Sequence, residues 1–260
     1  VLVYEGEDEN KARMANEHFR VRVGLPKMME MDEEWKTIKA LPQGKTTLVI
    51  IALCAIIYLL KISGNMGANL YSAFFISTPE SQFFEEIKHG QIWRLLTPIF
   101  LHLSFLHILF NMMWFKDLGY ILEYKLGRNF LLFFMIVTGI FSNVTQYLVA
   151  GPSFGGMSGV LYAMLGFVWI YHKLDPKFEI TLPNRDIGIM LAWLVACLTG
   201  WLGPIANTAH AGGLFAGMII ALVKSDGHQW KNKLKYFAVA SLFLVFTLVI
   251  EGVKLKGQYF

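Results

Sequence analysis

Charged side chains are scarce in this chain of 260 residues. Only 16 % of the residues are Asp, Glu, Lys or Arg, whereas 55 % are hydrophobic and 15 % are aromatic. A soluble domain carries more charge on its surface, so this composition favours an integral membrane protein. The net charge of +4 comes from basic residues scattered between apolar segments, and this pattern argues against a nucleic-acid partner.

Cysteine is almost absent as well. The two cysteines, Cys54 and Cys197, lie inside different apolar segments, which excludes a disulfide framework and a cysteine-ligated zinc site. The seven histidines show no ligand spacing on one helix face. We therefore expect neither a metal nor another cofactor.

Long apolar runs make up most of the chain. Stretches of about 15 to 20 mostly uncharged residues can cross a bilayer as helices. Six such segments lie near 46–63, 129–149, 157–172, 187–203, 207–223 and 234–253. A seventh segment, 102–124, is weaker because it carries several polar and charged residues. The pattern predicts an all-α polytopic membrane protein, with residues 224–260 forming a basic connection and an extra helix.

The first 45 residues have a different composition. "VLVYEG" is typical of a short strand and "EDENKARMANEHF" of an amphipathic helix. One strand and one helix cannot build a core, so we expect residues 1–45 to be the remnant of a small α/β domain whose beginning is missing.

The distribution of lysine and arginine predicts the orientation of the spans. Ten basic residues occur in or beside one set of alternate connections: Lys116, Lys125, Arg128, Lys173, Lys177, Arg185, Lys224, Lys231, Lys233 and Lys235. The opposite set holds Lys61, Lys88 and Arg94. Because basic residues favour the cytoplasmic side, we expect the N-terminus to be cytoplasmic.

Four polar side chains from three segments are predicted to lie near one depth. If the segments enter the membrane near Leu103, Phe154 and Ala206, a helical rise of ~1.5 Å per residue places His107, Ser158 and His210 roughly 6 Å inside. Asn111 then lies about one turn deeper. Polar residues in a membrane are costly, so a shared site is the simplest interpretation.

The chemistry of these groups suggests a hydrolase. A serine hydroxyl needs a base to take its proton, and histidine is a suitable base near neutral pH, so we expect Ser158 and His210 to form a dyad. His107, Asn111 and free backbone N–H groups near Ser158 would stabilise an oxyanion. The carboxylates considered as a third member, Asp117, Glu123, Asp175 and Asp186, lie toward the opposite side, so Tyr162 is expected to pack on the imidazole instead.

Each residue also has a structural interpretation. A serine in a membrane helix usually bonds to its own backbone. Small residues such as Gly159 and Gly213 allow close helix packing, Gly156 allows an open chain before Ser158, and Trp93 and Arg94 suit an interfacial loop. For His102, a structural hydrogen bond at the interface is the favoured role.

The motifs "HLSFLHILFN", "GMSGVLYAMLG" and "AHAGGLFAG", preceded by "WR" at Trp93–Arg94, resemble those of the rhomboid intramembrane serine proteases, in particular the bacterial GlpG-like group. The resemblance covers about residues 46–223 and implies a six-helix core. It implies Ser158 as nucleophile, His210 as base, and His107, Asn111 and the Ser158 amide as the oxyanion hole. Glu123 and Gly127 match a stabilising motif at the cytoplasmic end.

The implied function is cleavage of transmembrane substrates near their outer ends, in contact with membrane lipids, by a multi-pass protein of the bacterial inner membrane. The site would open toward the periplasm, with the segment around Trp193 and Trp201 or the outer loop as gate. Two alternatives are a rhomboid-like protein that binds membrane clients without cleavage and a channel or transporter that uses the polar cluster for permeation.

Overall fold

The computed structural model describes residues 33–63, 65–81, 83–175, 177–200, 205–225 and 230–257. Within this part of the chain the regular structure is entirely helical, in agreement with the predicted all-α class. The expected N-terminal strand and helix, and Trp201, lie outside the described residues.

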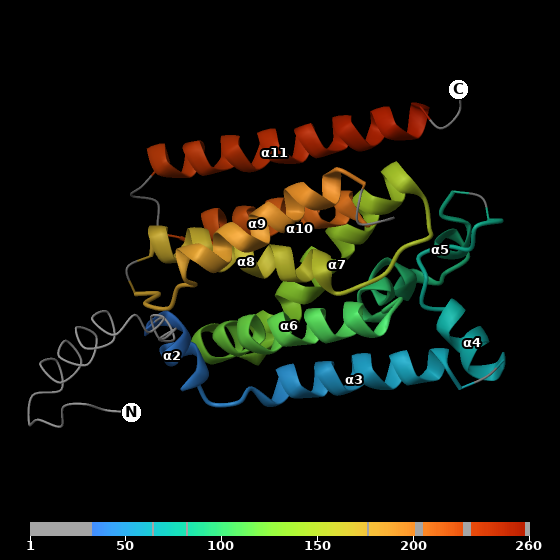
Figure 1. Ribbon diagram of the computed structural model, residues 1–260, viewed down its shortest axis with the longest axis horizontal. Helices are drawn as coiled ribbons and strands as arrows, with labels where there is room; N and C mark the ends of the chain where they lie inside the picture. Colours follow the sequence, from blue (N-terminus) through green and yellow to red (C-terminus); the bar gives the residue numbers. More distant parts are fainter. Residues whose placement is uncertain are drawn as a thin grey trace, which may run out of the picture. The chain divides into compact units, whose positions relative to one another are not determined.

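Each apolar segment expected to cross the membrane forms a helix (Figure 1). The long helices are α3 Lys45–Lys61, α6 Phe105–Leu126, α7 Arg128–Ala150, α8 Ser158–Leu174, α9 Asn184–Leu198, α10 Asn207–Lys224 and α11 Trp230–Gly257. Consecutive long helices run in opposite directions, so α6, α8 and α10 all begin at one end of the bundle. This arrangement brings their N-terminal turns together.

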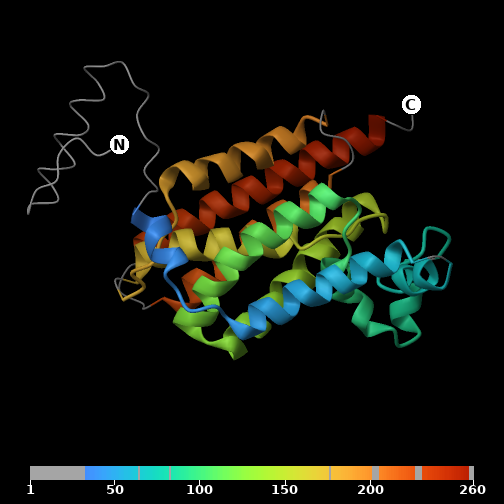
Figure 2. The same ribbon diagram turned by 60° about the horizontal axis from the view of Figure 1, so that its bottom comes forward.

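Short helices occupy the long connection between α3 and α6 and the segment before α3. They are α2 Glu33–Lys39, α4 Asn65–Ser72, α5 Glu85–Lys88, η1 Ile92–Leu95 and η2 Thr97–Phe100. The segments from α4 to η2 gather beside the C-terminal end of α3, at the end of the bundle where α6, α8 and α10 begin (Figures 1 and 2).

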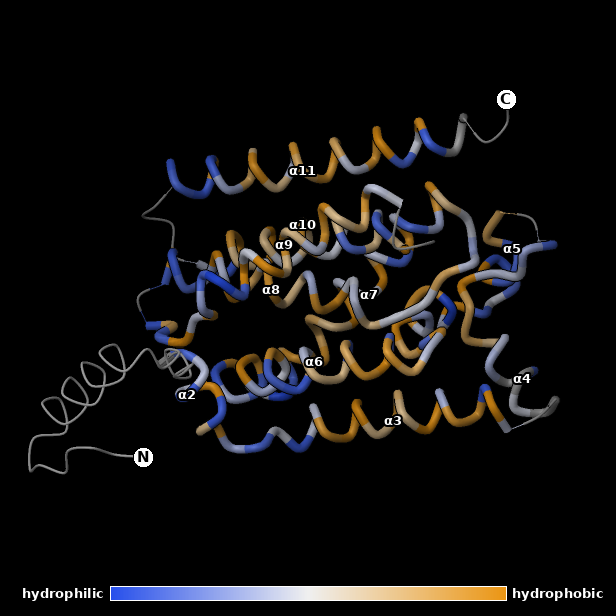
Figure 3. Tube along the Cα trace, in the orientation of Figure 1, coloured by the Kyte–Doolittle hydropathy of each residue, from blue (hydrophilic) through white to orange (hydrophobic). Residues whose placement is uncertain are grey.

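Large apolar side chains are exposed on the outer helices. Val49, Ile56 and Leu59 of α3 and Leu242 and Phe246 of α11 are each more than half exposed. Figure 3 shows apolar residues along the middle of these helices and hydrophilic residues toward their ends. An apolar surface of this extent is typical of a protein surrounded by lipid.

Two helices in the described part of the chain are long and apolar enough to cross a membrane by length and composition alone: Arg128–Ala150 and Lys231–Lys254. Only 11 % of the most apolar window of the second helix is buried. Because a soluble core helix would be mostly buried, the exposure of α11 indicates a helix that faces lipid.

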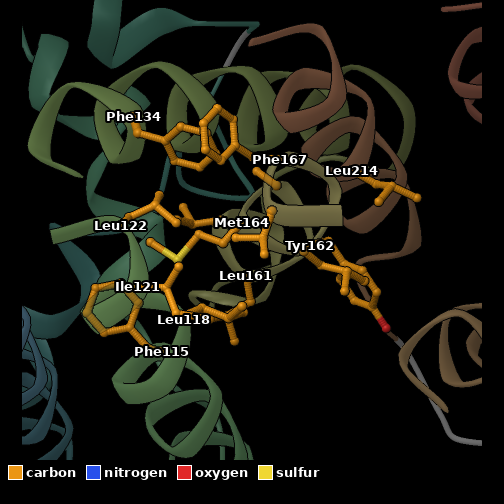
Figure 4. Packing of buried hydrophobic residues seen from close by; sticks show 14 of the residues in the cluster. Phe115, Leu118, Ile121, Leu122, Phe134, Leu161, Tyr162, Met164, Phe167 and Leu214 are labelled. Atoms are coloured by element: carbon orange, nitrogen blue, oxygen red, sulfur yellow. The ribbon is translucent and has the colours of Figure 1, made fainter. Parts of the chain in front are cut away.

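Helix α8 lies at the centre of the bundle. Its residues from Gly159 to Val168 are all buried, as expected of a helix that is apolar on every side. Phe167 packs edge-on against Phe134 of α7 with ring centroids 5.4 Å apart, and Phe115 of α6 belongs to the same core (Figure 4).

The contact between α8 and α10 is made through backbone atoms. A Cβ atom added to Gly213 would lie 1.9 Å from the carbonyl oxygen of Gly159, and one added to Gly217 would lie 1.9 Å from that of Ala163. Glycine is therefore required at both positions of α10. Such close approach is the usual consequence of small residues at helical spacing in membrane proteins.

Candidate active site

Ser158 is the first residue of α8. Residues 151–157 are not helical, and Gly156 has φ +134°. The glycine-rich stretch before Ser158 is therefore a non-helical connection, and the predicted span 157–172 coincides with α8 to within two residues. At a helix N-terminus the first backbone N–H groups have no intrahelical acceptor, and they are available to a ligand.

His210 contacts Ser158 directly. The distance between its Nε2 atom and the Ser158 Oγ is 2.7 Å. Because the hydroxyl can donate to Nε2, the neutral imidazole carries its proton on Nδ1. The side chain of His210 is buried, and its Nδ1 has no hydrogen-bond partner among the described residues.

Tyr162 lies against the imidazole of His210. The two ring centroids are 4.9 Å apart with an interplanar angle of 37°. The Tyr162 hydroxyl donates to the carbonyl oxygen of Met190 on α9, 3.0 Å away. The phenol therefore supports the histidine by packing while its polar atom is satisfied on a neighbouring helix.

His107 and Gly156 lie side by side in front of the serine. A Cβ on Gly156 would be 2.6 Å from Nε2 of His107 and 3.7 Å from Oγ of Ser158. The backbone N–H of Leu103 points at Nδ1 of His107 at 3.4 Å. With Nδ1 accepting, the proton of the neutral ring is on Nε2, the atom that faces the serine side of the site.

Asn111 is buried one turn below His107 and lines the same cavity. Its Nδ2 donates to the carbonyl oxygen of His107, 2.9 Å away, within its own helix. This bond uses one of the two amide hydrogens, so the other can be donated to a substrate.

His102 packs behind these residues. It is fully buried, with Nδ1 3.1 Å from the Phe100 oxygen, and its ring lies edge-on to His107 with centroids 5.2 Å apart. Its carbonyl oxygen accepts from the Tyr71 hydroxyl. These contacts tie the start of α6 to the long connection.

Trp93 and Arg94 behave differently from one another. Trp93 is exposed, as expected for an interfacial residue, but Arg94 is buried. The guanidinium of Arg94 donates to the Phe75 oxygen at 2.8 Å and to Gln91 Oε1 at 2.7 Å. The charge of Arg94 is therefore not presented to the surroundings but holds a turn of the connection.

The same connection is braced by Glu86. Its carboxylate accepts from the Ser77 hydroxyl at 2.6 Å, the Thr78 backbone N–H at 2.9 Å and the Ser81 hydroxyl at 2.7 Å. Partial burial acts to raise the pKa of Glu86, but these hydrogen bonds outweigh it and lower the pKa to about 2.

A cavity of about 1190 Å³ joins these groups. Ser158, His210, His107, Asn111 and Tyr162 all line it. Its walls also include Trp193 of α9, which is about half exposed. The described residues include no group of three His, Cys, Asp or Glu that could hold a metal ion.

Three further polar residues at this cavity were not predicted from the sequence. Gln146 of α7 accepts from the Thr208 hydroxyl and the Ala209 N–H, and thereby caps the start of α10. Asn207 of α10 donates to Glu251 of α11, which also lines the cavity. The sequence signal that could have identified them is that each lies near the end of an apolar segment on the side where Ser158 and His210 were expected.

The opposite end of the bundle holds a second polar cluster. The Glu123 carboxylate accepts from the Thr46 N–H at 2.9 Å and from both the N–H and the hydroxyl of Thr47 at 2.8 Å. Gly127, with φ +84°, forms the turn between α6 and α7. This cluster attaches α3 to α6 and takes no part in the cavity.

Comparison with known proteins gives a consistent result. The family model described as "Rhomboid domain" matches residues 89–227. The chain is 41 % identical over 180 residues to Rhomboid protease GlpG of Yersinia pseudotuberculosis serotype I (strain IP32953), which covers 68 % of this chain and 62 % of that protein. It is 34 % identical over 182 residues to Rhomboid protease GlpG of Salmonella paratyphi A (strain ATCC 9150 / SARB42), with 69 % and 63 % covered. The chain thus spans less than two thirds of the length of these relatives.

Proposed function

Since this chain belongs to the rhomboid family, we propose that it is an intramembrane serine endopeptidase that cleaves transmembrane segments with a Ser158–His210 dyad. The observation that carries the proposal is the 2.7 Å contact between Ser158 Oγ and His210 Nε2 inside a cavity walled by lipid-facing helices. That contact is the geometry required of a nucleophile and its base.

In the proposed reaction, Ser158 Oγ attacks the scissile carbonyl carbon while its proton moves to Nε2 of His210. The resulting imidazolium then gives that proton to the leaving amine, and an ester to Ser158 remains. Water, deprotonated by the same histidine, attacks the ester and restores the free hydroxyl.

The oxyanion of each tetrahedral intermediate needs donors that are already in place. The candidates are the Ser158 N–H at the start of α8, Nε2–H of His107 and the second amide hydrogen of Asn111, whose first hydrogen is donated to the His107 oxygen. Gly156 keeps this space open because any larger residue would meet the His107 ring.

The proposed substrates are single transmembrane helices with a locally unstable segment. A peptide bond inside an intact helix has its carbonyl already hydrogen-bonded, so unwinding must precede attack. The cavity lies at the end of the bundle opposite the connections richest in lysine and arginine, and we assign that end to the periplasmic side of a bacterial inner membrane.

The test is reaction of the purified protein with a fluorophosphonate probe, together with cleavage assays on several single-span membrane proteins. We expect the parent to be labelled once, Ser158→Ala to be unlabelled, and His210→Ala to react at least ~100-fold more slowly. Cleavage should follow the same order.

Two matched variants serve as controls. Ser225→Ala removes a buried hydroxyl at the far end of α10 that donates to Leu222 of the same helix, and His89→Ala removes an exposed histidine of the connection. Both should react like the parent. If the parent is not labelled and cleaves none of the substrates, the result favours a protein that binds membrane clients without catalysis. If Ser158→Ala is still labelled, the nucleophile is a residue other than Ser158.

A further inference from the structure

Two buried polar atoms at the start of α10 have no hydrogen-bond partner among the described residues. One is Nδ1 of His210 and the other is Oδ1 of Asn207. The two side chains are 5 % and 4 % exposed, and both line the cavity that contains Ser158. Residues three apart on a helix are neighbours on one face, so the two atoms belong to adjacent side chains.

The orientation of the Asn207 amide is fixed by its other contacts. Its Nδ2 donates to the Cys197 carbonyl oxygen at 3.1 Å and to Oε1 of Glu251 at 3.0 Å. A carbonyl and a carboxylate can only accept, so both amide hydrogens are used. Only the acceptor Oδ1 remains, on the helix that carries His210.

His210 offers the complementary group. With the Ser158 hydroxyl as the donor to Nε2, the ring proton lies on Nδ1 and is available as a donor. A buried donor and a buried acceptor on neighbouring side chains are each costly when unpaired, so a hydrogen bond between these two groups would be favourable.

We infer that Glu251 and Asn207 form a positioning relay in which the Glu251 carboxylate orients the Asn207 amide so that its Oδ1 accepts the Nδ1–H of His210. The relay rests on the proposed dyad. When Ser158 transfers its proton to Nε2, the Nδ1 proton stays on the ring and is held by Oδ1, so the imidazolium is stabilised without a carboxylate in direct contact.

The carboxylate comes from α11, which lies outside the region matched by the family model. Lys254 holds it in place by donating to Oε1 of Glu251 at 2.7 Å and to the Leu198 oxygen at 2.6 Å. The seventh helix is thereby connected to the C-terminal end of α9 and the N-terminal end of α10.

Several titratable groups line the cavity beside His210: His107 of α6, Tyr162 of α8, and Glu251 and Lys254 of α11. From α9, the carbonyl oxygen of Cys197 accepts from Asn207. From α7 the cavity receives Gln146 and Ala150, which do not titrate. A test of the relay must therefore change Asn207, or Glu251 together with its ion-pair partner Lys254, while His107 and Tyr162 stay in place.

The experiment measures the rate of fluorophosphonate labelling of Ser158 from pH 5 to 9 in the full chain. In Asn207→Ala we expect labelling to slow by about 10- to 100-fold, the loss that follows when one hydrogen bond to a charged group is removed. The acidic midpoint should move down by about 0.5 to 1 pH unit, because a weaker Nδ1 acceptor disfavours the imidazolium.

A second variant removes the α11 partner without leaving a lone charge. Glu251→Leu combined with Lys254→Met should shift the acidic midpoint in the same direction, by a smaller amount. Thr247→Val is the matched control, since Thr247 is buried on α11 and bonds to Phe243 of its own helix. Its pH profile should equal that of the parent.

Rescue distinguishes a relay from a purely structural role. Asn207→Asp with Glu251→Gln exchanges the amide and the carboxylate, so the carboxylate placed on α10 can accept from both of its neighbours. We expect labelling within about threefold of the parent and an acidic midpoint at or above that of the parent. The relay would be overturned if Asn207→Ala had the same acidic midpoint as the parent. It would also be overturned if the exchange variant were labelled no faster than Asn207→Ala. Loss of the proposed function is recognised separately, by labelling that does not depend on Ser158.

Discussion

The pair α8–α10 and the pair α3–α6 are joined in different ways. In α8–α10 the contact is between backbones, with Gly213 and Gly217 against the carbonyl oxygens of Gly159 and Ala163. In α3–α6 the helix start is held by a side chain, the Glu123 carboxylate on the Thr46 and Thr47 amides. The first contact sets the distance between Ser158 and His210, and the second only attaches a helix.

This difference indicates where the molecule tolerates change. A backbone contact has no side-chain rotamers that could make room for an added atom, so a larger residue there displaces one helix from the other. A side-chain cap can be lost for the energy of its hydrogen bonds, and the helices behind it stay in register. We therefore expect substitutions in α8–α10 to abolish activity and those in α3–α6 to lower stability alone.

The largest effect is expected for Gly213→Ala. Its Cβ would lie 1.9 Å from the Gly159 oxygen, so α10 must move away from α8, and we expect a loss of about 3 kcal/mol or more and labelling reduced at least ~100-fold. Thermal unfolding in detergent and probe labelling measure the two effects.

The control is Gly188→Ala on α9, where the added Cβ meets nothing within 4 Å. Because alanine favours helix, this variant should be more stable than the parent by about 0.5 to 1 kcal/mol. If Gly213→Ala and Gly188→Ala had the same effect on stability and labelling, the backbone contact would not be what holds α8 and α10 together.

Gly156→Ala should remove activity at a smaller cost in stability. The residue has φ +134°, and its Cβ would lie 2.6 Å from Nε2 of His107, so the new methyl group displaces the imidazole. We expect labelling to fall by about 100-fold and the free energy of unfolding by about 1 to 3 kcal/mol.

Gly90→Ala is the control that separates the effect of backbone strain at positive φ from the effect of a steric clash with His107. Gly90 also has positive φ, +92°, but a Cβ there has nothing within 4 Å. This variant should lose stability and keep the labelling rate of the parent. An equal loss of labelling in both variants would attribute the effect to backbone strain alone.

Glu123→Ala tests the other pair. Removal of the carboxylate deprives Thr46 and Thr47 of their acceptor, and we expect a loss of about 1 to 2 kcal/mol with labelling per folded molecule unchanged within twofold. Glu179→Ala, which breaks the exposed pair with Lys125, should cost less than about 0.5 kcal/mol. A labelling rate that fell with Glu123→Ala would contradict the distinction between the two pairs.

The smallest effect concerns Glu86 in the connection between α3 and α6. Its pKa is lowered to about 2 in the folded protein, so the carboxylate stabilises the fold at pH values above its ordinary pKa. This contribution is lost as the pH falls from about 4.5 toward 2. Melting temperatures of the parent and Glu86→Gln should therefore differ at pH 7 and converge as the pH approaches 2.

Glu80→Gln, at an exposed acidic residue of the same connection, is the control for this series. It should melt with the parent throughout the pH range. A difference between parent and Glu86→Gln that stayed constant down to pH 2 would mean that the three donors do not act through the charge of Glu86.

Much of the fold was readable from the sequence because apolar length and helical spacing are local properties. The seven apolar segments coincide with α3 and α6 to α11, and the small residues at 159, 163, 213 and 217 share helix faces that meet. The same spacing placed His107 above Asn111 and Ser158 above Tyr162. Each of these inferences needs only one helix at a time.

Where the chain is not helical, the prediction was less accurate. The start of α8 was predicted to within one residue, but the φ of +134° at Gly156 is a backbone property that no apolar pattern reveals. For Arg94 the sequence suggested a place in an interfacial loop, and only the hydrogen bonds to Phe75 and Gln91 show that its guanidinium is buried within that connection.

By itself the sequence determined that the chain is a bundle of lipid-facing helices with a serine and two histidines near one end. Periodicity defines the polar face of each helix, but the rotation of one helix against another depends on contacts between residues far apart in the chain. Only the tertiary structure therefore decided that Glu251 of α11 reaches Asn207, that Gln146 caps α10, and that Ser158 lies 2.7 Å from His210.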